Sequence, residues 1–229
     1  MQKKLISIYK NLLKDYSYQG WWPIKNKYHP KDYSLPKTEN EIFEIMVGAI
    51  LTQNTLWKNV EKAIYNLYSK KIMSVAGILK TSQKALAKLI KPAGYYNQKA
   101  ERIILLAKYL QKNYNSKPSK MFRKNIQKLR KELLGLKGIG NETADSIILY
   151  GAKKPVFVVD AYTKRIFSRM GFFKENETYE NIQKFFMQNL KSDYKLYNEY
   201  HALIVELAKR SCTKKKICEK CIVKKFCRN

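Results

Sequence analysis

The sequence predicts an all-α fold, because apolar residues recur at helical spacing along most of the chain. In the first segment, for example, Leu5, Ile8 and Leu12 fall on one side of a helix. The segments that show this pattern are residues 1–18, 38–69, 74–110, 123–135, 182–190 and 194–209. A second observation marks one helix start: Thr38 and Glu41 have the spacing of a capping box.

The chain is long enough to bury a core, and it is strongly basic. It has 229 residues, of which 45% are hydrophobic, which excludes a disordered polycation. Lysine and arginine number 46 against 18 acidic residues, giving a formal net charge of +28. An excess this large indicates a polyanionic partner. Nucleic acid is the leading interpretation, and an anionic membrane surface is the competing one.

Membrane and export signals are not evident in the sequence. No stretch of about 18 apolar residues could span a bilayer. Residues 1–16 have a short basic start but lack the apolar core and cleavage site of a signal peptide. A basic amphipathic helix with a large apolar face, typical of membrane-surface proteins, is also not evident. We therefore expect an intracellular protein.

Residues 133–171 contain two features that bear on function, and the first is a glycine turn between helices. Gly138 and Gly140 flank Ile139, so the backbone can turn sharply and lie bare at the surface. Asn141 is a candidate N-cap for the helix that follows. The amide hydrogens at such a helix start suit a phosphate, although many turns of this kind only connect helices.

The second feature is a carboxylate at a helix start. The apolar run Val156–Val159 ends at Asp160, and a helical pattern follows it. Asp160 therefore occupies an N-cap position, and capping could be its whole role. With Lys164 and Arg165 nearby, we expect its carboxylate to stay ionised at neutral pH.

The segments LKGIGNETA and VVDAYTKRI resemble the helix-hairpin-helix and Gly/Pro-Asp signature of the endonuclease III superfamily of DNA glycosylases. The resemblance extends from about Pro36 to Cys227. It implies two helical domains flanking a DNA-binding cleft. We expect a central domain at residues 38–150, which ends in the hairpin, and a discontinuous domain formed by residues 1–37 and 151–229.

The resemblance also implies roles for particular residues. Asp160 would be the catalytic residue, and the hairpin would bind duplex DNA through Gly138, Ile139, Gly140 and Thr143. Cleavage of the bond between base and deoxyribose builds positive charge on the sugar. A carboxylate can stabilise that charge and activate a water for attack. The target base must leave the stack to be reached.

Two further loops resemble loops of the family that enter the duplex. LTQNT resembles the loop whose glutamine fills the gap left by the flipped nucleotide, which indicates Gln53. Capping of a helix that starts at Thr55 is the alternative role for Gln53. GYYNQKA is similar to the loop that carries an intercalating wedge, which would be Tyr95 or Tyr96. Tyr96 could equally be a core residue.

Trp21 and Trp22 precede Pro23, and two interpretations of this pair stay open. The rings could simply pack beneath a loop. Alternatively, one or both could line a pocket for a flat, positively charged alkylated purine, which an aromatic face would attract by stacking and by cation–π interaction. An aromatic pair at this place resembles the branch of the superfamily that removes 3-methyladenine.

All four cysteines fall near the C-terminus, in the spacing C-x5-C-x2-C-x5-C. They are Cys212, Cys218, Cys221 and Cys227. An intracellular location disfavours disulfides. Zinc is one metal that the four cysteines could bind. The arrangement resembles the family's cluster loop, with one residue fewer in the first gap, and implies one structural [4Fe–4S] cluster. Phosphate contacts are expected from the intervening lysines Lys214, Lys215, Lys216, Lys220, Lys224 and Lys225.

Many bifunctional members of the family carry a nucleophilic lysine just after the hairpin glycines, where this chain has Glu142. A carboxylate cannot form a Schiff base. Neither Lys137, Lys153 nor Lys164 stands at that position. The resemblance therefore implies a monofunctional glycosylase without AP lyase activity. His201, a lone histidine in a helical pattern, is interpreted as structural.

The favoured function is excision of an alkylated purine, above all 3-methyladenine, from duplex DNA by a monomeric protein of the cytoplasm, associated with the nucleoid. This choice depends on the tryptophan pair and on the missing lysine. Alternatives within the enzyme class are an endonuclease III-like glycosylase/AP lyase for oxidised pyrimidines and a glycosylase for uracil or thymine mismatches. A non-enzymatic helix-hairpin-helix DNA-binding module is the alternative outside it.

Overall fold

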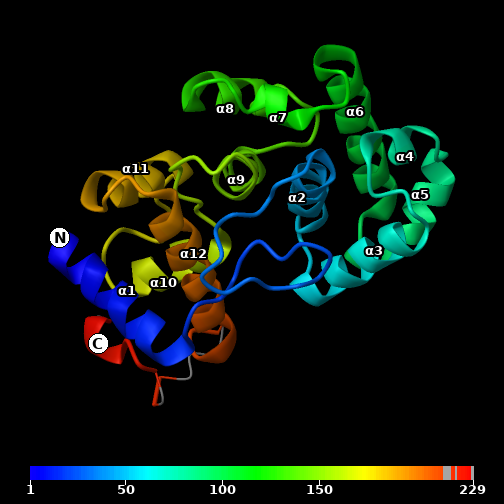
Figure 1. Cartoon of the computed structure of the whole chain (residues 1–229). Coiled ribbons are helices and arrows are strands. Elements are labelled where there is room, and N and C mark those ends of the chain that lie inside the picture. Colours follow the sequence, from blue (N-terminus) through cyan, green and yellow to red (C-terminus); the bar gives the residue numbers. More distant parts are fainter. Residues whose placement is uncertain (214–217, 220, 228–229) are drawn as a thin grey trace. The chain divides into compact units, whose positions relative to one another are not determined.

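The protein is described by a computed structural model that covers residues 1–213, 218–219 and 221–227. Within these ranges the chain is helical and forms no strand, and one isolated bridge joins Ile24 and Lys27 (Figure 1). The predicted all-α fold is therefore confirmed. None of the helices in these ranges combines the length and apolar character needed to cross a membrane.

The helices in chain order are α1 (Gln2–Tyr16), α2 (Glu39–Leu51), α3 (Trp57–Ser69), α4 (Val75–Leu79), α5 (Gln83–Leu89), η1 (Lys91–Ala93), α6 (Tyr96–Tyr114), α7 (Pro118–Met121), α8 (Ile126–Leu134), α9 (Asn141–Ser146), η2 (Ile147–Gly151), α10 (Ala161–Arg169), α11 (Tyr179–Asn189), α12 (Tyr194–Arg210) and η3 (Lys224–Phe226).

The chain forms two compact units. The terminal unit consists of Met1–Trp21, His29–Tyr33 and Lys154–Asn229, and the central unit consists of Trp22–Tyr28 and Ser34–Lys153. The largest difference from the expected boundaries concerns Trp22–Tyr28, which belong to the central unit.

Packing around α2 explains why this short loop joins the central unit. The Trp22 ring meets the rings of Trp57 and Tyr150 at centroid distances of 5.2 Å. The amide of Lys25 donates to Glu44 Oε1 at 2.8 Å. Glu44 is fully buried on α2, and desolvation raises its pKa to about 7 although hydrogen bonds oppose the shift.

The core of the central unit is built around α2 and α6. Every residue from Ile42 to Leu51 is buried, so α2 is enclosed on all sides. The predicted capping box is present: Thr38 Oγ1 accepts from the Glu41 amide, and the Glu41 side chain accepts from the Thr38 amide. α6 packs against α2, α4 and α5. These contacts fix the loops that follow α2 and precede α6.

The terminal unit is built around α12, which packs against α1 and α10 (Figure 1). The Phe157 ring stacks on Phe186 with a centroid distance of 4.1 Å and an interplanar angle of 4°. Gln183 Nε2 donates to the Phe157 carbonyl at 2.7 Å. The extended segment Val156–Val159 is thereby fixed in the core, and it ends at Asp160. Core packing therefore determines where this carboxylate lies.

Candidate nucleic-acid interface and catalytic carboxylate

The hairpin between α8 and α9 is a tight turn that depends on glycine. Gly138 has a φ of +80°, a conformation that L side chains rarely adopt. A Cβ atom at this position would also lie 2.3 Å from Arg102 Nε. Ile139 is buried, so only its backbone could contact a ligand. At Gly138–Gly140 the hairpin therefore presents backbone rather than side chains.

An ion pair behind the turn holds its two helices together. Arg130 on α8 donates to both carboxylate oxygens of Asp145 on α9, at 2.7 and 3.1 Å. The same guanidinium donates to Asn141 Oδ1 at 3.0 Å. The expectation that Asn141 caps α9 is wrong: the N-cap is Gly140, and the Asn141 side chain accepts from arginine instead.

Gln53 fastens the loop after α2 to this hairpin. Its Nε2 donates to the Gly138 carbonyl at 2.9 Å and to Thr143 Oγ1 at 3.0 Å. Its Oε1 accepts from Arg102 Nη1 at 2.6 Å. Thr143 is buried, so its hydroxyl supports the turn from behind. Entry of Gln53 into a duplex would require it to leave these partners.

The alternative role that we considered for Gln53 is wrong. α3 begins at Trp57, its N-cap is Leu56, and no side chain caps it. A helix starting at Thr55 does not exist, and the Gln53 side chain is directed to the hairpin.

The turn before α6 presents one tyrosine to solvent. Tyr95 has a left-handed backbone, with φ of 45° and ψ of 32°, and is 64% exposed. Such a conformation is uncommon for an aromatic residue and is typical of functional turns. Tyr96, the first residue of α6, is half-buried. Tyr95 is therefore the better candidate for the wedge.

Lys99 is a residue that the sequence analysis missed. It is 1% exposed, and its Nζ donates to the carbonyls of Leu51, Gln53 and Ala93 at 2.7–2.9 Å. Desolvation, with a smaller contribution from the charge of Arg102, lowers its pKa to about 8. The signal in the sequence was its place on the apolar face of α6, where a lysine is unusual.

Asp160 is the N-cap of α10, and both of its oxygens face hydrogen-bond donors. Oδ1 accepts from the Thr163 amide at 2.6 Å, and Oδ2 lies 3.6 Å from His201 Nε2. The side chains of Asp160 and His201 are each 12% exposed. The carboxylate is therefore largely enclosed, with a small opening to solvent.

The pKa of Asp160 is lowered despite this burial. Desolvation acts to raise it, but the hydrogen bond and charge of His201 and the bonds from Thr163 outweigh that effect. The carboxylate is therefore ionised at neutral pH, as expected, but for a different reason. Arg165, one of the expected partners, instead donates to the Cys212 carbonyl at 2.6 Å. His201, interpreted as structural, is a direct neighbour of the carboxylate.

Trp22 is buried in the central unit, in line with the packing alternative for this ring. An ideal Cβ at Gly48 would lie 2.9 Å from its Cζ2 atom, so the indole is tightly enclosed on this side. Trp21 belongs to the terminal unit and is half-buried. Within the fold the two tryptophans therefore have different surroundings, and Trp21 is the better candidate to meet a base.

The described cysteines lie at the end of the terminal unit. The amides of Cys221, Lys224 and Cys227 donate to the carbonyls of Cys218, Cys221 and Lys224, respectively, at 2.9–3.2 Å. Among the described residues, no three His, Cys, Asp or Glu side chains are placed to hold a metal ion. Of the lysines expected to contact phosphate there, Lys214, Lys215, Lys216 and Lys220 lie outside the described residues.

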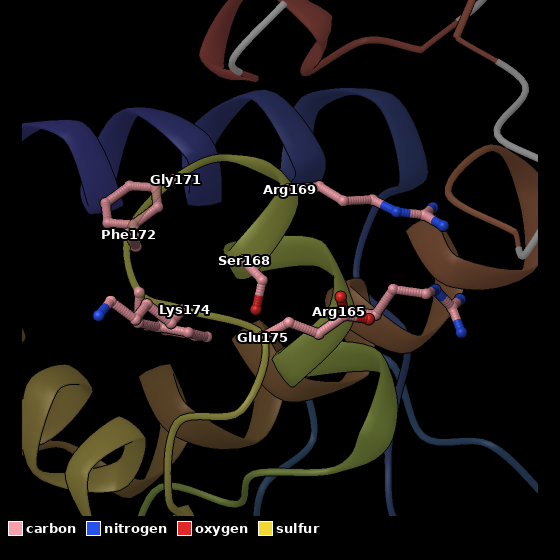
Figure 2. A pocket seen from close by; sticks show the side chains of 8 residues that line it. Arg165, Ser168, Arg169, Gly171, Phe172, Lys174 and Glu175 are labelled. Carbon is pink, nitrogen blue, oxygen red and sulfur yellow. The ribbon is translucent and has the colours of Figure 1, made fainter.

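Two arginines on α10 hold the first cysteine. Arg165 donates to the Cys212 carbonyl, and Arg169 Nη1 lies 3.3 Å from Cys212 Sγ. Figure 2 shows both side chains extending in the same direction from α10, with Lys174 on the other side of the pocket. This pocket of about 700 Å³ lies towards the C-terminal end of α10, and Asp160 does not line it. It is therefore distinct from the surroundings of the carboxylate.

Comparison with known proteins identifies the relatives of this fold. Residues 47–192 match the family described as HhH-GPD superfamily base excision DNA repair protein. A Methanocaldococcus jannaschii protein named as a candidate DNA repair glycosylase is 45% identical, over 97% of this chain and 95% of its own. Endonuclease III of Thermotoga maritima is 31% identical, over 82% of this chain and 84% of its own.

A solved structure resembles the whole fold. The Helicobacter pylori 3-methyladenine DNA glycosylase bound to 1,N6-ethenoadenine superimposes with a TM-score of 0.69 at 30% identity. The alignment covers 91% of this chain and 95% of that one.

The two hairpin glycines provide a matched pair of variants. Gly138→Ala forces an L residue to φ of +80° against Arg102, so we expect a loss of about 1–2 kcal/mol of stability. Gly140→Ala has no atom within 4 Å of the new methyl and a φ of −96°, so its stability should be unchanged. If the hairpin backbone grips phosphate, both variants bind an undamaged duplex more weakly. Urea unfolding and fluorescence anisotropy measure the two effects. Wild-type affinity of Gly140→Ala would contradict the hairpin's assigned role.

Proposed function

The chain belongs to the HhH-GPD superfamily of base excision DNA repair proteins, and from this membership we propose that it is a monofunctional DNA N-glycosylase. The observation that supports the proposal most strongly is the ionised, largely enclosed carboxylate of Asp160 at the start of α10. Duplex DNA containing a damaged base is the proposed substrate, and the excess of lysine and arginine supports that partner.

Asp160 is proposed to act on the sugar of the flipped nucleotide. Departure of the base leaves positive charge on the deoxyribose, which a carboxylate in a water-poor site stabilises strongly. The same group can orient a water and accept its proton during attack on C1′. Thr163 and His201 hold the carboxylate in one orientation, so little reorganisation is needed during the reaction.

The lysines near the hairpin support a hydrolytic rather than a lyase mechanism. Glu142 is an exposed first-turn residue of α9 and cannot form a Schiff base. Lys137 Nζ pairs with Glu101 at 2.6 Å, and Lys153 Nζ donates to the Ser34 carbonyl. We therefore propose that the product is an abasic site with an intact strand.

An alkylated purine such as 3-methyladenine is the proposed base. The likeness to the H. pylori 3-methyladenine DNA glycosylase supports this choice, and so does the aromatic surface of Trp21. A positively charged base gains from an aromatic face by cation–π attraction. The relatives named endonuclease III favour the endonuclease III-like alternative, for which oxidised pyrimidines are the expected bases. Mismatched uracil or thymine is the further alternative.

We also propose that Cys212, Cys218, Cys221 and Cys227 hold one [4Fe–4S] cluster, with zinc as the alternative. Four thiolates are the donor set that this cluster requires. The Arg169 guanidinium beside Cys212 Sγ suits a negatively charged thiolate ligand. A bound cluster would hold together the segment that contains the four cysteines, which has little hydrophobic core of its own. A monomer in the cytoplasm, associated with the nucleoid, remains the proposed state of the protein.

Asp160→Asn tests the catalytic proposal. The amide is nearly isosteric and keeps an oxygen for the Thr163 amide, but it carries no charge, so turnover should fall by about 10³-fold or more. DNA affinity should stay within about threefold, because the hairpin is unaltered. Release of free base is measured from duplexes that carry 3-methyladenine, an oxidised pyrimidine, uracil or a thymine mismatch. Unchanged turnover would contradict the role of Asp160, and absence of turnover in the wild type on every duplex would favour the binding module.

Borohydride treatment tests the missing lysine. During base release the wild-type protein should form no borohydride-stable adduct with the DNA, because no amine attacks C1′. Denaturing gels should show an intact strand until the abasic site is cleaved with alkali. A trapped adduct that appears in parallel with base release would overturn the monofunctional assignment.

Metal analysis tests the cluster. Protein purified without oxygen should contain about four iron atoms and as much acid-labile sulfide per chain. Cys221→Ser should lose most of this iron and unfold at lower temperature. One zinc per chain without sulfide would identify the alternative site.

A further inference from the structure

Lys99 places a charged group on the apolar face of α6. The other buried residues of this helix are all apolar: Ala100, Ile103, Leu106, Ala107 and Leu110. Burial of an ammonium group is costly unless its hydrogens are bonded. A residue that the core tolerates at this cost must make contacts that an apolar side chain could not make.

All three hydrogens of the Lys99 ammonium have acceptors, and every acceptor is a main-chain carbonyl. Two acceptors lie where α2 ends: the carbonyls of Leu51 at 2.9 Å and of Gln53 at 2.7 Å. The third is the Ala93 carbonyl in η1, at 2.8 Å. Carbonyls at a helix C-terminus lack partners within the helix and attract positive charge. The ammonium therefore joins two loops that are distant in the sequence.

These two loops carry both candidate intercalating residues. Lys99 binds the main chain of Gln53 directly, and its own amide donates to the Tyr95 carbonyl at 3.0 Å. Arg102, three residues further along α6, holds the Gln53 side chain through Oε1. The N-terminal part of α6 therefore fixes the positions of Gln53 and Tyr95 relative to each other, within one compact unit.

We propose that Lys99 is a positioning residue, which keeps the Gln53 loop and the Tyr95 turn in register so that both enter the duplex together. The inference rests on the proposed glycosylase function, because it assigns these loops to the opening of DNA. Extrusion of a base loses stacking and pairing interactions, which a wedge and a gap-filling side chain must offset at the same moment. Lys99 acts only through the two loops and does not touch the reacting atoms.

If Lys99 has this role, the effect of its loss on the rate of base release should depend on how firmly the target base is paired. Lys99→Met keeps most of the length of the side chain but removes every side-chain donor. Loss of register should slow extrusion from a fully paired duplex, whereas an unpaired base needs little help. A residue that only supports the fold would affect both substrates by the same factor.

The experiment compares single-turnover base release from one lesion, either paired in a duplex or placed in an unpaired bubble. For Lys99→Met we expect a rate about tenfold or more below wild type on the paired lesion and within about threefold on the bubble. Lys108 is an exposed lysine on the same helix, so Lys108→Met is the control and should match the wild-type rate on both substrates. Equal losses of Lys99→Met on the two substrates, or none on either, would overturn the proposal.

Two additions keep the test decisive. If Lys99→Met does not fold, as judged by circular dichroism, Lys99→Gln, whose shorter side chain keeps an amide donor but cannot bond all three carbonyls, replaces it under the same criterion. If the wild type releases no base from any duplex, the glycosylase function fails. In that case 2-aminopurine fluorescence beside the lesion still measures duplex opening. Opening by the wild type and by Lys108→Met, but not by the Lys99 variant, supports the positioning role; equal opening by all of them refutes it.

Discussion

The proposed catalysis depends on a carboxylate that stays charged while most of it is removed from water. Desolvation alone would favour protonation of Asp160, and a neutral acid could not stabilise a positively charged sugar. Two neighbours oppose protonation: the imidazole of His201 and the hydrogen bonds from Thr163. α10 and α12 pack together in the terminal unit, so the fold that forms this core also forms the charged site.

The central unit also contains a buried charge that is stabilised by hydrogen bonds, but this charge is positive. There the buried charge is the ammonium of Lys99, and its partners are main-chain carbonyls rather than an acid. Together with Arg102 and Gln53 it connects the loop after α2, the turn before α6 and the hairpin. The hairpin, which we propose to bind phosphate through its backbone, needs support of this kind, because its own side chains there are short or buried. Gly138 and Ile139 illustrate both cases.

Features that depend on neighbouring residues could be predicted from the sequence. The capping box of Thr38 and Glu41, the turn at Gly138 and the cap of α10 at Asp160 all involve residues three or fewer positions apart. Features that depend on distant residues could not. His201 reaches Asp160 only because α12 packs on α10, and Trp22 joins the central unit only because Trp57 and Tyr150 surround it. Even a local prediction, the capping of α9 by Asn141, was wrong, because Arg130 of the preceding helix binds the Asn141 side chain instead.

The most direct measurement of the central claim is a carboxyl ¹³C NMR titration of Asp160 in the free protein. Its signal is identified by its loss in Asp160→Asn. In the folded protein, the wild-type carboxyl should remain ionised at pH values below about 3.9, which is the ordinary pKa of an aspartate. His201→Gln removes the charge that opposes desolvation, so its Asp160 pKa should be higher than in the wild type. A wild-type carboxyl that protonates above the ordinary value, or one that is indifferent to His201, would contradict the account.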